Sequence, residues 1–109
     1  MSSQNNDQRI LSLAGLAQRA GLAASGEQEA EQAVRNGKAR LVLLACDASE
    51  GTVKKFSHRC FYYSVPLARL SVGKKELGRA IGKSERSSLA ICEEGFAKSI
   101  LNLTEKIEL

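Results

Sequence analysis

Tryptophan is absent from the 109-residue sequence, and only two tyrosines and three phenylalanines are present. So few aromatic side chains argue against a base-stacking platform of the RRM kind. Long apolar runs are also missing, because the longest, Leu41 to Cys46, is far shorter than the roughly 20 residues of a membrane-spanning helix. The segment from Met1 to Gln8 is polar and carries no basic region of a signal peptide. We therefore expect a cytoplasmic protein that does not bind membranes.

The residues that hold metal ions are scarce. The three cysteines form no C-x-x-C pair, and the single histidine, His58, cannot complete a zinc site with them. Cys46 and Cys92 each end an apolar run, which is typical of small buried thiols in a reducing compartment. We expect neither a metal nor another cofactor.

No pairing of a nucleophile with a base stands out. His58 lies among basic residues on the expected solvent side of a helix. Asp47 and Ser49 follow a predicted strand, the place where open α/β sheets bind ligands. Helix capping explains both residues without a substrate, so a small hydrolase working there is the remotest alternative. The sequence predicts a protein that is not an enzyme.

Positive charge is in excess, with 16 Lys and Arg against 12 Asp and Glu, a net charge of +4 and a pI near 9.2. Such a balance suits an anionic partner such as nucleic acid, although it also serves solubility alone. The segment from Lys74 to Arg86 holds five basic residues against Glu76 and Glu85. Lys38 and Arg40 add charge near the turn after the second predicted helix.

Hydrophobic periodicity predicts alternating helices and strands. Helices are expected at residues 7–20, 25–37, after Asp47, at 74–82 and from 95 onward, and strands at 22–24, 41–46, 65–70 and 89–92. The strand at 41–46 is apolar on both faces, as in a sheet covered by helices on both sides. We predict one domain over residues 7–109, preceded by a flexible polar N-terminus at 1–6. Its fold class is α/β, a three-layer α/β/α sandwich around a small mixed, mostly parallel four-stranded sheet in which the first strand runs antiparallel.

Local signals mark where the helices begin and end. Ser25 with Gln28 reads as a capping box for the second helix, and Asp47 with Glu50 reads as a cap for the third. The third helix carries Val53, Phe56, Cys60 and Tyr63 on one expected buried stripe. Gly82 is expected to end the fourth helix with a positive φ.

The sequence Gly82-Lys83-Ser84 ends like a nucleotide-binding phosphate loop. That loop requires G-x-x-x-x-G-K-[ST] between a strand and a following helix. Here Leu77 occupies the first glycine position, and the predicted helix precedes the motif instead of following it. We interpret the match as accidental.

Several blocks together resemble the bacterial YlxQ-like branch of the large-subunit ribosomal protein superfamily that binds kink-turn RNA (the seven-Ae and thirty-e proteins). The resemblance covers roughly residues 8–103 in order and spacing. The blocks are Gly15 to Gly21, Ser25 to Glu27, Asp47 to Glu50, Leu77 to Lys83 and Gly95 to Lys98. It implies an α/β/α sandwich and RNA binding without catalysis.

The resemblance also implies where RNA binds. A glycine at the start of the second helix lets the RNA approach the backbone, and polar residues in the next turn read the edges of sheared G·A pairs. The matching positions are Gly26, Glu27, Gln28 and Glu29. The loop from Gly82 to Ser88 corresponds to the one that touches the extruded nucleotide.

Two departures from the family pattern bear on specificity. Gln32 stands where kink-turn binders usually have a lysine, and the loop that is apolar in many members is polar here. The second helix is also acidic, with Glu27, Glu29 and Glu31. We expect phosphate contacts from Lys38, Lys83 and Arg86.

The predicted partner is structured RNA, with ribosomal RNA or the ribosome among the candidates. The rival hypothesis is a protein-interaction module on the same fold that has lost RNA affinity through its acidic second helix.

Overall fold

The computed structural model describes residues 3–108 of the chain. The elements in order are α1 (Ser3–Arg19), β1 (Ala23–Ser25), α2 (Glu27–Arg35), β2 (Leu41–Leu44), α3 (Glu50–Tyr63), β3 (Leu67–Arg69), α4 (Lys74–Ala80), β4 (Ser88–Ile91) and α5 (Glu94–Glu108). All nine predicted elements are present. The first helix begins at Ser3, within the segment 1–6 that we expected to be a flexible N-terminus.

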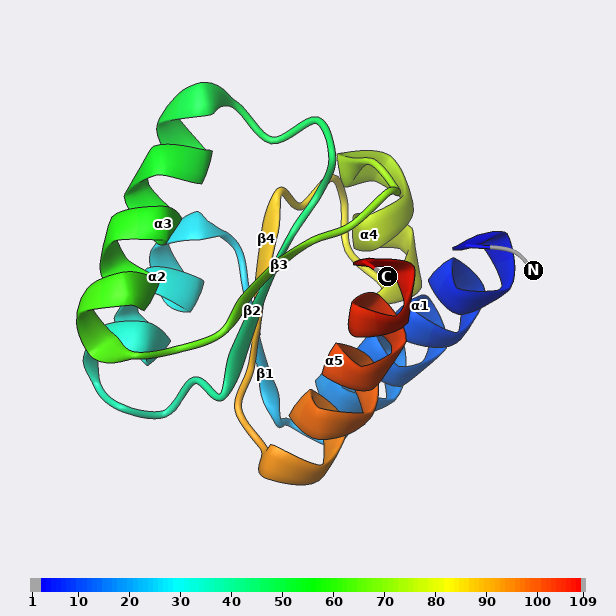
Figure 1. Ribbon diagram of the computed structural model, residues 1–109, viewed down its shortest axis with the longest axis horizontal. Coiled ribbons are helices and arrows are strands. Elements are labelled where there is room, and N and C mark those ends of the chain that lie inside the picture. Colours follow the sequence, from blue (N-terminus) through cyan, green and yellow to red (C-terminus); the bar gives the residue numbers. More distant parts are fainter. Residues whose placement is uncertain (1–2, 109) are drawn as a thin grey trace.

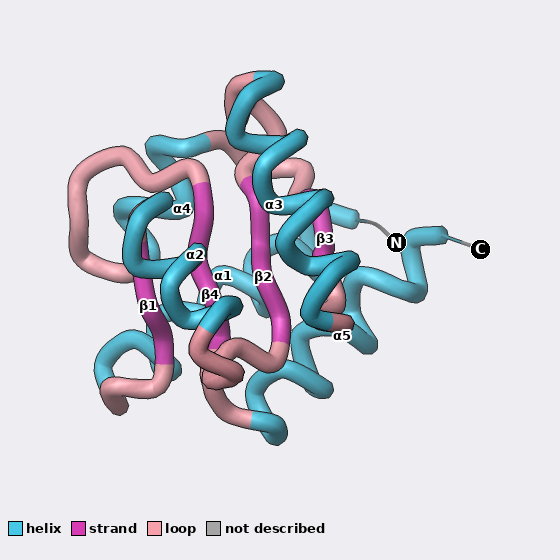
Figure 2. Tube along the Cα trace, turned by 90° about the vertical axis from the view of Figure 1, so that its left-hand side faces the viewer, coloured by secondary structure: helices cyan, strands magenta, loops and turns pink. Residues whose placement is uncertain are grey.

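The sheet has the strand order β1-β4-β2-β3 (Figure 2). Only β2 and β3 pair in parallel, whereas β4 pairs antiparallel with both β1 and β2. The sheet is mixed, as predicted, but two of its three strand pairs are antiparallel, so the prediction of mostly parallel pairing is wrong. The strands β1, β2 and β3 run in the same direction. The antiparallel strand is β4, which lies between β1 and β2, and not the first strand as we expected. Hydrophobic periodicity indicates that a strand is buried but not which strands lie beside it. The position of β4 between β1 and β2 could therefore not be predicted from the sequence.

Helices cover both faces of the sheet, with α2 and α3 on one side and α1, α4 and α5 on the other (Figure 1). All four residues of β2 are buried, and they alternate between the two layers. Leu41 and Leu43 pack with α1, α4 and α5, while Val42 and Leu44 pack against α2 and α3 around Phe56. The predicted α/β/α sandwich is confirmed.

The two cap residues of the Asp47 to Glu50 segment serve different helices. Ser49, not Asp47, caps α3, because its side chain accepts a hydrogen bond from the Thr52 amide. The Asp47 carboxylate instead accepts from the Lys74 amide at 2.9 Å and so caps α4, 27 residues further on. The sequence pattern identified capping residues but not the helix that each one caps.

Gly82 ends α4 with a φ of +73°. The Lys83 amide donates to the Gly78 carbonyl and the Gly82 amide donates to the Arg79 carbonyl, which together form a Schellman motif. The Gly-Lys-Ser sequence is therefore a helix C-terminus. The Gly82 and Lys83 amides already donate to carbonyls of α4, so they cannot wrap phosphates as the amides of a nucleotide-binding loop do.

The three thiols differ in exposure. Cys60 is buried, Cys92 is half-buried and Cys46 is exposed. The prediction of a buried Cys46 is wrong because β2 ends at Leu44, two residues earlier. Burial raises the pKa of the Cys60 thiol to about 11, which keeps it protonated and unreactive.

Candidate nucleic-acid interface

No side chain caps the N-terminus of α2. Ser25 pairs with Leu89 in the sheet, so it does not cap the helix, and the expected capping box is absent. Gly26 is the N-cap residue, with φ +98° and ψ 153°, and it offers no side chain to the first-turn amides. Non-glycine residues rarely adopt this conformation, so the sheet can pass directly into α2 only because residue 26 is glycine.

The loop after α4 lies beside this helix start. The Gly26 amide donates to the carbonyl of Ser88 at 3.2 Å, which joins the beginning of α2 to the end of the loop. At its other side, the loop packs on α4, and the Arg86 amide donates to the Lys74 carbonyl. A Cβ at Gly78 would overlap the carbonyl oxygen of Ser84. Gly78 thus allows the loop backbone to lie directly against α4.

Two charged side chains flank Gly26. An ideal Cβ at position 26 would lie 3.1 Å from the Glu29 Oε1 atom and 4.0 Å from the Arg86 Nε atom. The Arg86 guanidinium also donates to the Ser84 hydroxyl at 3.0 Å and to the Glu85 carbonyl at 2.9 Å. Arg86 is therefore held by its own loop at the start of α2. We call Gly26, Gln28, Glu29 and Arg86 the Gly26 surface.

The acidic face of α2 is largely neutralised by α3. The Lys55 ammonium lies 3.2 Å from the Glu27 carboxylate and 3.5 Å from that of Glu31. Arg59 donates to the Glu31 carboxylate at 2.7 Å and holds the pKa of that carboxyl below its usual range. The hydrogen bond to Glu27 in turn raises the pKa of Lys55. Of the three glutamates, Glu27 and Glu31 therefore form ion pairs with α3.

Sequence reasoning missed the role of these two α3 cations. Lys55 and Arg59 are four residues apart and so share one face of a helix. Glu27 and Glu31 are also four residues apart and share one face of α2. These two matching spacings were the only sign in the sequence that the helices could pair through opposite charges. Nothing in the sequence shows that the two faces meet.

The exposed side of α2 is polar. Gln28 and Gln32 are exposed one turn apart. With Glu31, Arg35 and Asn36 they line a hollow of about 310 Å³. Gln28 and Gln32 are therefore free to contact a ligand lying across α2.

The predicted phosphate contacts do not form one group. Arg86 adjoins Gly26, and Lys83 is exposed at the beginning of the same loop. Lys38 follows α2 and lies near Cys92, at the opposite end of β4 from Ser88. The length of a four-residue strand, about 13 Å, separates the two ends. Lys38 thus lies apart from the Gly26 surface.

Other kinds of site find little support in residues 3–108. No cluster of three or more His, Cys, Asp and Glu side chains that could hold a metal ion occurs among the described residues. Asp47 and Ser49 are both engaged as helix caps, and His58 is exposed. Among the helices that the structure describes, none combines the length and the apolar character needed to cross a bilayer.

Comparison with known protein families gives a clear match. The sequence model of the ribosomal protein L7Ae/L30e/S12e/Gadd45 family matches residues 8–101. The chain is 42% identical to the RNA-binding protein YlxQ of Bacillus subtilis (strain 168), over 85% of this chain and 92% of that protein. It is 40% identical to the protein of the same name from Enterococcus faecium, over 94% of this chain and 98% of that one.

Solved structures with the same fold include a protein of unknown function from Bacillus halodurans. That structure has a TM-score of 0.83 and 38% identity, and the match covers 88% of this chain and 96% of the other. The 15.5 kD RNA binding protein of Giardia lamblia has a TM-score of 0.77 and 26% identity, with 95% of this chain and 88% of that one covered.

Proposed function

Because the chain belongs to the ribosomal protein L7Ae/L30e/S12e/Gadd45 family, we propose that it is a non-catalytic RNA-binding protein that binds structured, kink-turn-like RNA at the Gly26 surface. The observation that carries this proposal is an uncapped helix start with an arginine held beside it. The two relatives named above as RNA-binding proteins support it, as does the RNA binding protein of similar structure.

The start of α2 has the chemistry of a phosphate site. First-turn amides of a helix carry a partial positive charge and donate to anions, and no side chain caps them here. Gly26 adds no side chain of its own at this point, and the Arg86 guanidinium provides a fixed positive charge next to it. Phosphates would supply most of the affinity.

Selectivity would come from the first turn of α2. The Gln28 amide can donate to and accept from a base edge, while the Glu29 carboxylate can accept from a base amino group. Both side chains are exposed. Sheared G·A pairs offer base edges of this kind, which is why we propose a kink-turn-like target, with ribosomal RNA as one source.

The acidity of α2 was the reason for the rival hypothesis of a protein-interaction module. Lys55 and Arg59 pair with Glu27 and Glu31, so most of that negative charge is compensated inside the protein. Among the described residues, Glu29 is the one glutamate of the three without a basic partner on α3. This arrangement favours RNA binding over its loss.

The experiment measures binding of a synthetic RNA with a kink-turn internal loop, compared with a fully paired duplex of equal length. Gln28→Glu replaces an exposed amide by a carboxylate and should weaken kink-turn binding at least tenfold without changing the melting temperature. Gln8→Glu, the same change at an exposed position of α1 in the opposite layer, is the matched control and should have no effect. Gln32→Lys should tighten binding, because it adds a cation one turn from Gln28.

Salt provides a second readout. Engaging about four phosphates predicts a log–log slope of about −3 to −4, scaled from the duplex relation. Equal affinity for the two RNAs would contradict kink-turn specificity. Absence of binding to both would contradict RNA binding itself.

A further inference from the structure

Three of the five aromatic side chains gather at the end of α3. Phe61 is 88% exposed, Tyr62 is 78% exposed and Tyr63 is 40% exposed. The rings of Tyr62 and Tyr63 pack edge to face with their centroids 4.8 Å apart. The prediction of a buried Tyr63 is wrong, because α3 ends there and Ser64, with φ +59°, turns the chain away. Large aromatic groups this exposed typically mark an interaction site.

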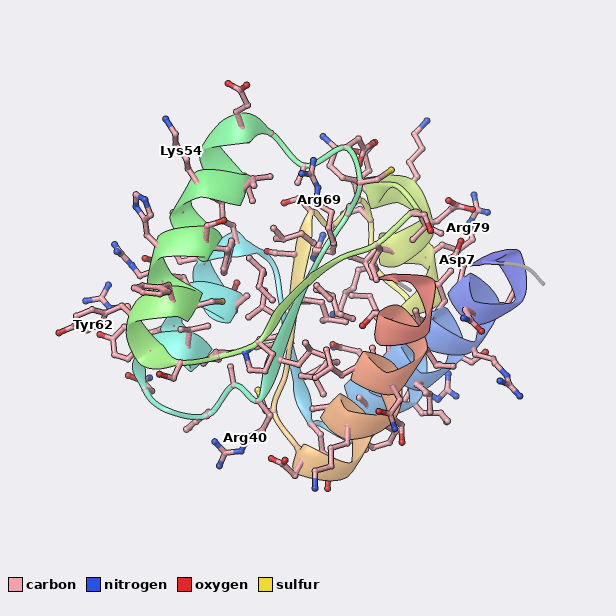
Figure 3. All side chains as sticks on the ribbon, viewed as in Figure 1. Asp7, Arg40, Lys54, Tyr62, Arg69 and Arg79 are labelled. Atoms are coloured by element: carbon pink, nitrogen blue, oxygen red, sulfur yellow. The ribbon has the colours of Figure 1, made fainter. Side chains whose placement is uncertain are left out.

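The exposed face of α3 is also basic. Lys54, His58 and Phe61 follow the i, i+4, i+7 spacing of a single helix face, and all three are exposed. Figure 3 shows Lys54 and Tyr62 extending from α3 away from the sheet. Lys54 forms no ion pair within the described residues, and the helix has no carboxylate after Glu50. The combination of aromatic rings and an unpaired lysine suits a polyanion with flat groups, such as a nucleic acid.

The helix that carries this face packs beside α2, which begins at the Gly26 surface. Glu27 pairs with Lys55 and Glu31 pairs with Arg59, so α2 and α3 run side by side in the same direction. From Lys55 to Tyr62 the helix rises about 10 Å, which equals about three stacked nucleotides of one strand. A strand that leaves the start of α2 can therefore reach the aromatic end of α3 within a few nucleotides.

We propose that Phe61 and Tyr62 form a stacking platform for unpaired nucleotides that flank the RNA bound at the Gly26 surface. This inference rests on the proposed function and extends it from a folded RNA element to its single-stranded neighbour. Nucleotide bases of any identity can stack on aromatic side chains, and basic groups beside the rings bind the phosphates. Lys54 and His58 are the groups placed to do so. The platform thus contributes affinity without choosing the bases.

The protein carries its own reporter for this contact. Tyr62 of the platform and its neighbour Tyr63 are the only tyrosines, and tryptophan is absent, so all intrinsic tyrosine fluorescence comes from the end of α3. The probes are the kink-turn RNA with blunt ends and the same RNA with single-stranded extensions of ten adenosines. After correction for absorption by the RNA, the extended RNA should quench this fluorescence and the blunt RNA should not.

The double variant Phe61→Ala/Tyr62→Ala gives the second readout. It should bind the extended RNA at least fivefold more weakly than the parent protein, bind the blunt RNA equally well, and melt at the same temperature because both rings are exposed. Leu16→Ala, which truncates an exposed apolar side chain of α1 in the other layer, is the control and should change neither affinity.

The two proposals fail separately. Binding to the blunt RNA tests the Gly26 surface alone, and the difference between extended and blunt RNA tests the platform. If the double variant and the parent bind the extended RNA equally, the platform is overturned while the proposed function stands. If the parent sediments as a dimer and the double variant as a monomer, the aromatic face is a self-association surface and the proposal is also overturned.

Discussion

For the replacement of Gly78 by alanine, helix propensity and the structure predict opposite changes in the free energy of unfolding. Gly78 lies inside α4, where helix propensity alone predicts that Gly→Ala stabilises by about 0.5–1 kcal/mol. The structure predicts a loss. An added Cβ would overlap the Ser84 carbonyl oxygen and would lie 2.7 Å from the Ser84 carbonyl carbon and 3.1 Å from the Glu85 Cα atom. All of these are backbone atoms, so no side chain can rotate away to make room.

The magnitude follows from the two opposing effects. Overpacking of this kind costs about 1–3 kcal/mol, and the propensity gain offsets up to about 1 kcal/mol of it. We expect a net loss of about 1–2 kcal/mol in the free energy of unfolding. With an m-value of about 1.5 kcal/mol/M for a domain of this size, the urea midpoint would fall by about 1 M.

Urea unfolding followed by far-UV circular dichroism measures this change. Gly51→Ala in the first turn of α3 is the matched control, since its Cβ would meet only the Ser49 Oγ atom at 3.9 Å. The control should be as stable as the parent or slightly more stable. The Gly78 variant should also bind kink-turn RNA more weakly while still folded, because the displaced loop carries Arg86. A Gly78→Ala protein at least as stable as the parent would refute the reasoning.

Three further outcomes are expected. Gly82→Val should lower stability by about 1 kcal/mol or more in thermal melts, because φ is +73° there and the space around a Cβ is otherwise empty. Since the hydrogen bond from Arg59 lowers the pKa of Glu31, that carboxylate stabilises above its unfolded pKa and stops doing so as the pH falls through its folded pKa. Glu31→Gln should therefore cost up to about 1 kcal/mol in urea at neutral pH, and progressively less as the pH falls through the folded pKa of that carboxyl. A thiol reagent should label Cys46 in the native protein and Cys60 only on unfolding, because burial raises the pKa of Cys60 to about 11.

Replacing Gly26 illustrates how a conformational angle changes the design of an experiment. From the sequence, a glutamate there looks harmless, since helix starts accept carboxylates. The φ of +98° and ψ of 153° make any side chain at this position costly to the fold. Gln28→Glu is the cleaner probe because Gln28 is exposed and lies within the helix.

Periodicity was sufficient to predict each helix and strand and the layered fold, because burial on one or two faces leaves a direct trace in residue order. It was insufficient wherever two distant segments meet. The capping of α4 by Asp47 and the neutralisation of Glu31 by Arg59 are contacts of this kind. The sequence also placed Gly26 and Arg86 in one candidate site only through family resemblance, and the structure brings them together.

The position of β4 has a consequence for the order in which the protein acquires its function. β4 is the last strand to be synthesised, yet it lies between β1 and β2, and β1 pairs with no other strand among the described residues. Until Ser88 has left the ribosome, β1 has no neighbour and the Gly26 amide lacks its acceptor. Such pairings between distant segments also form slowly. A nascent chain therefore contains Gly26 and Gln28 long before the proposed RNA site can form, and a chain stalled on the ribosome before Ser88 is expected not to bind RNA there.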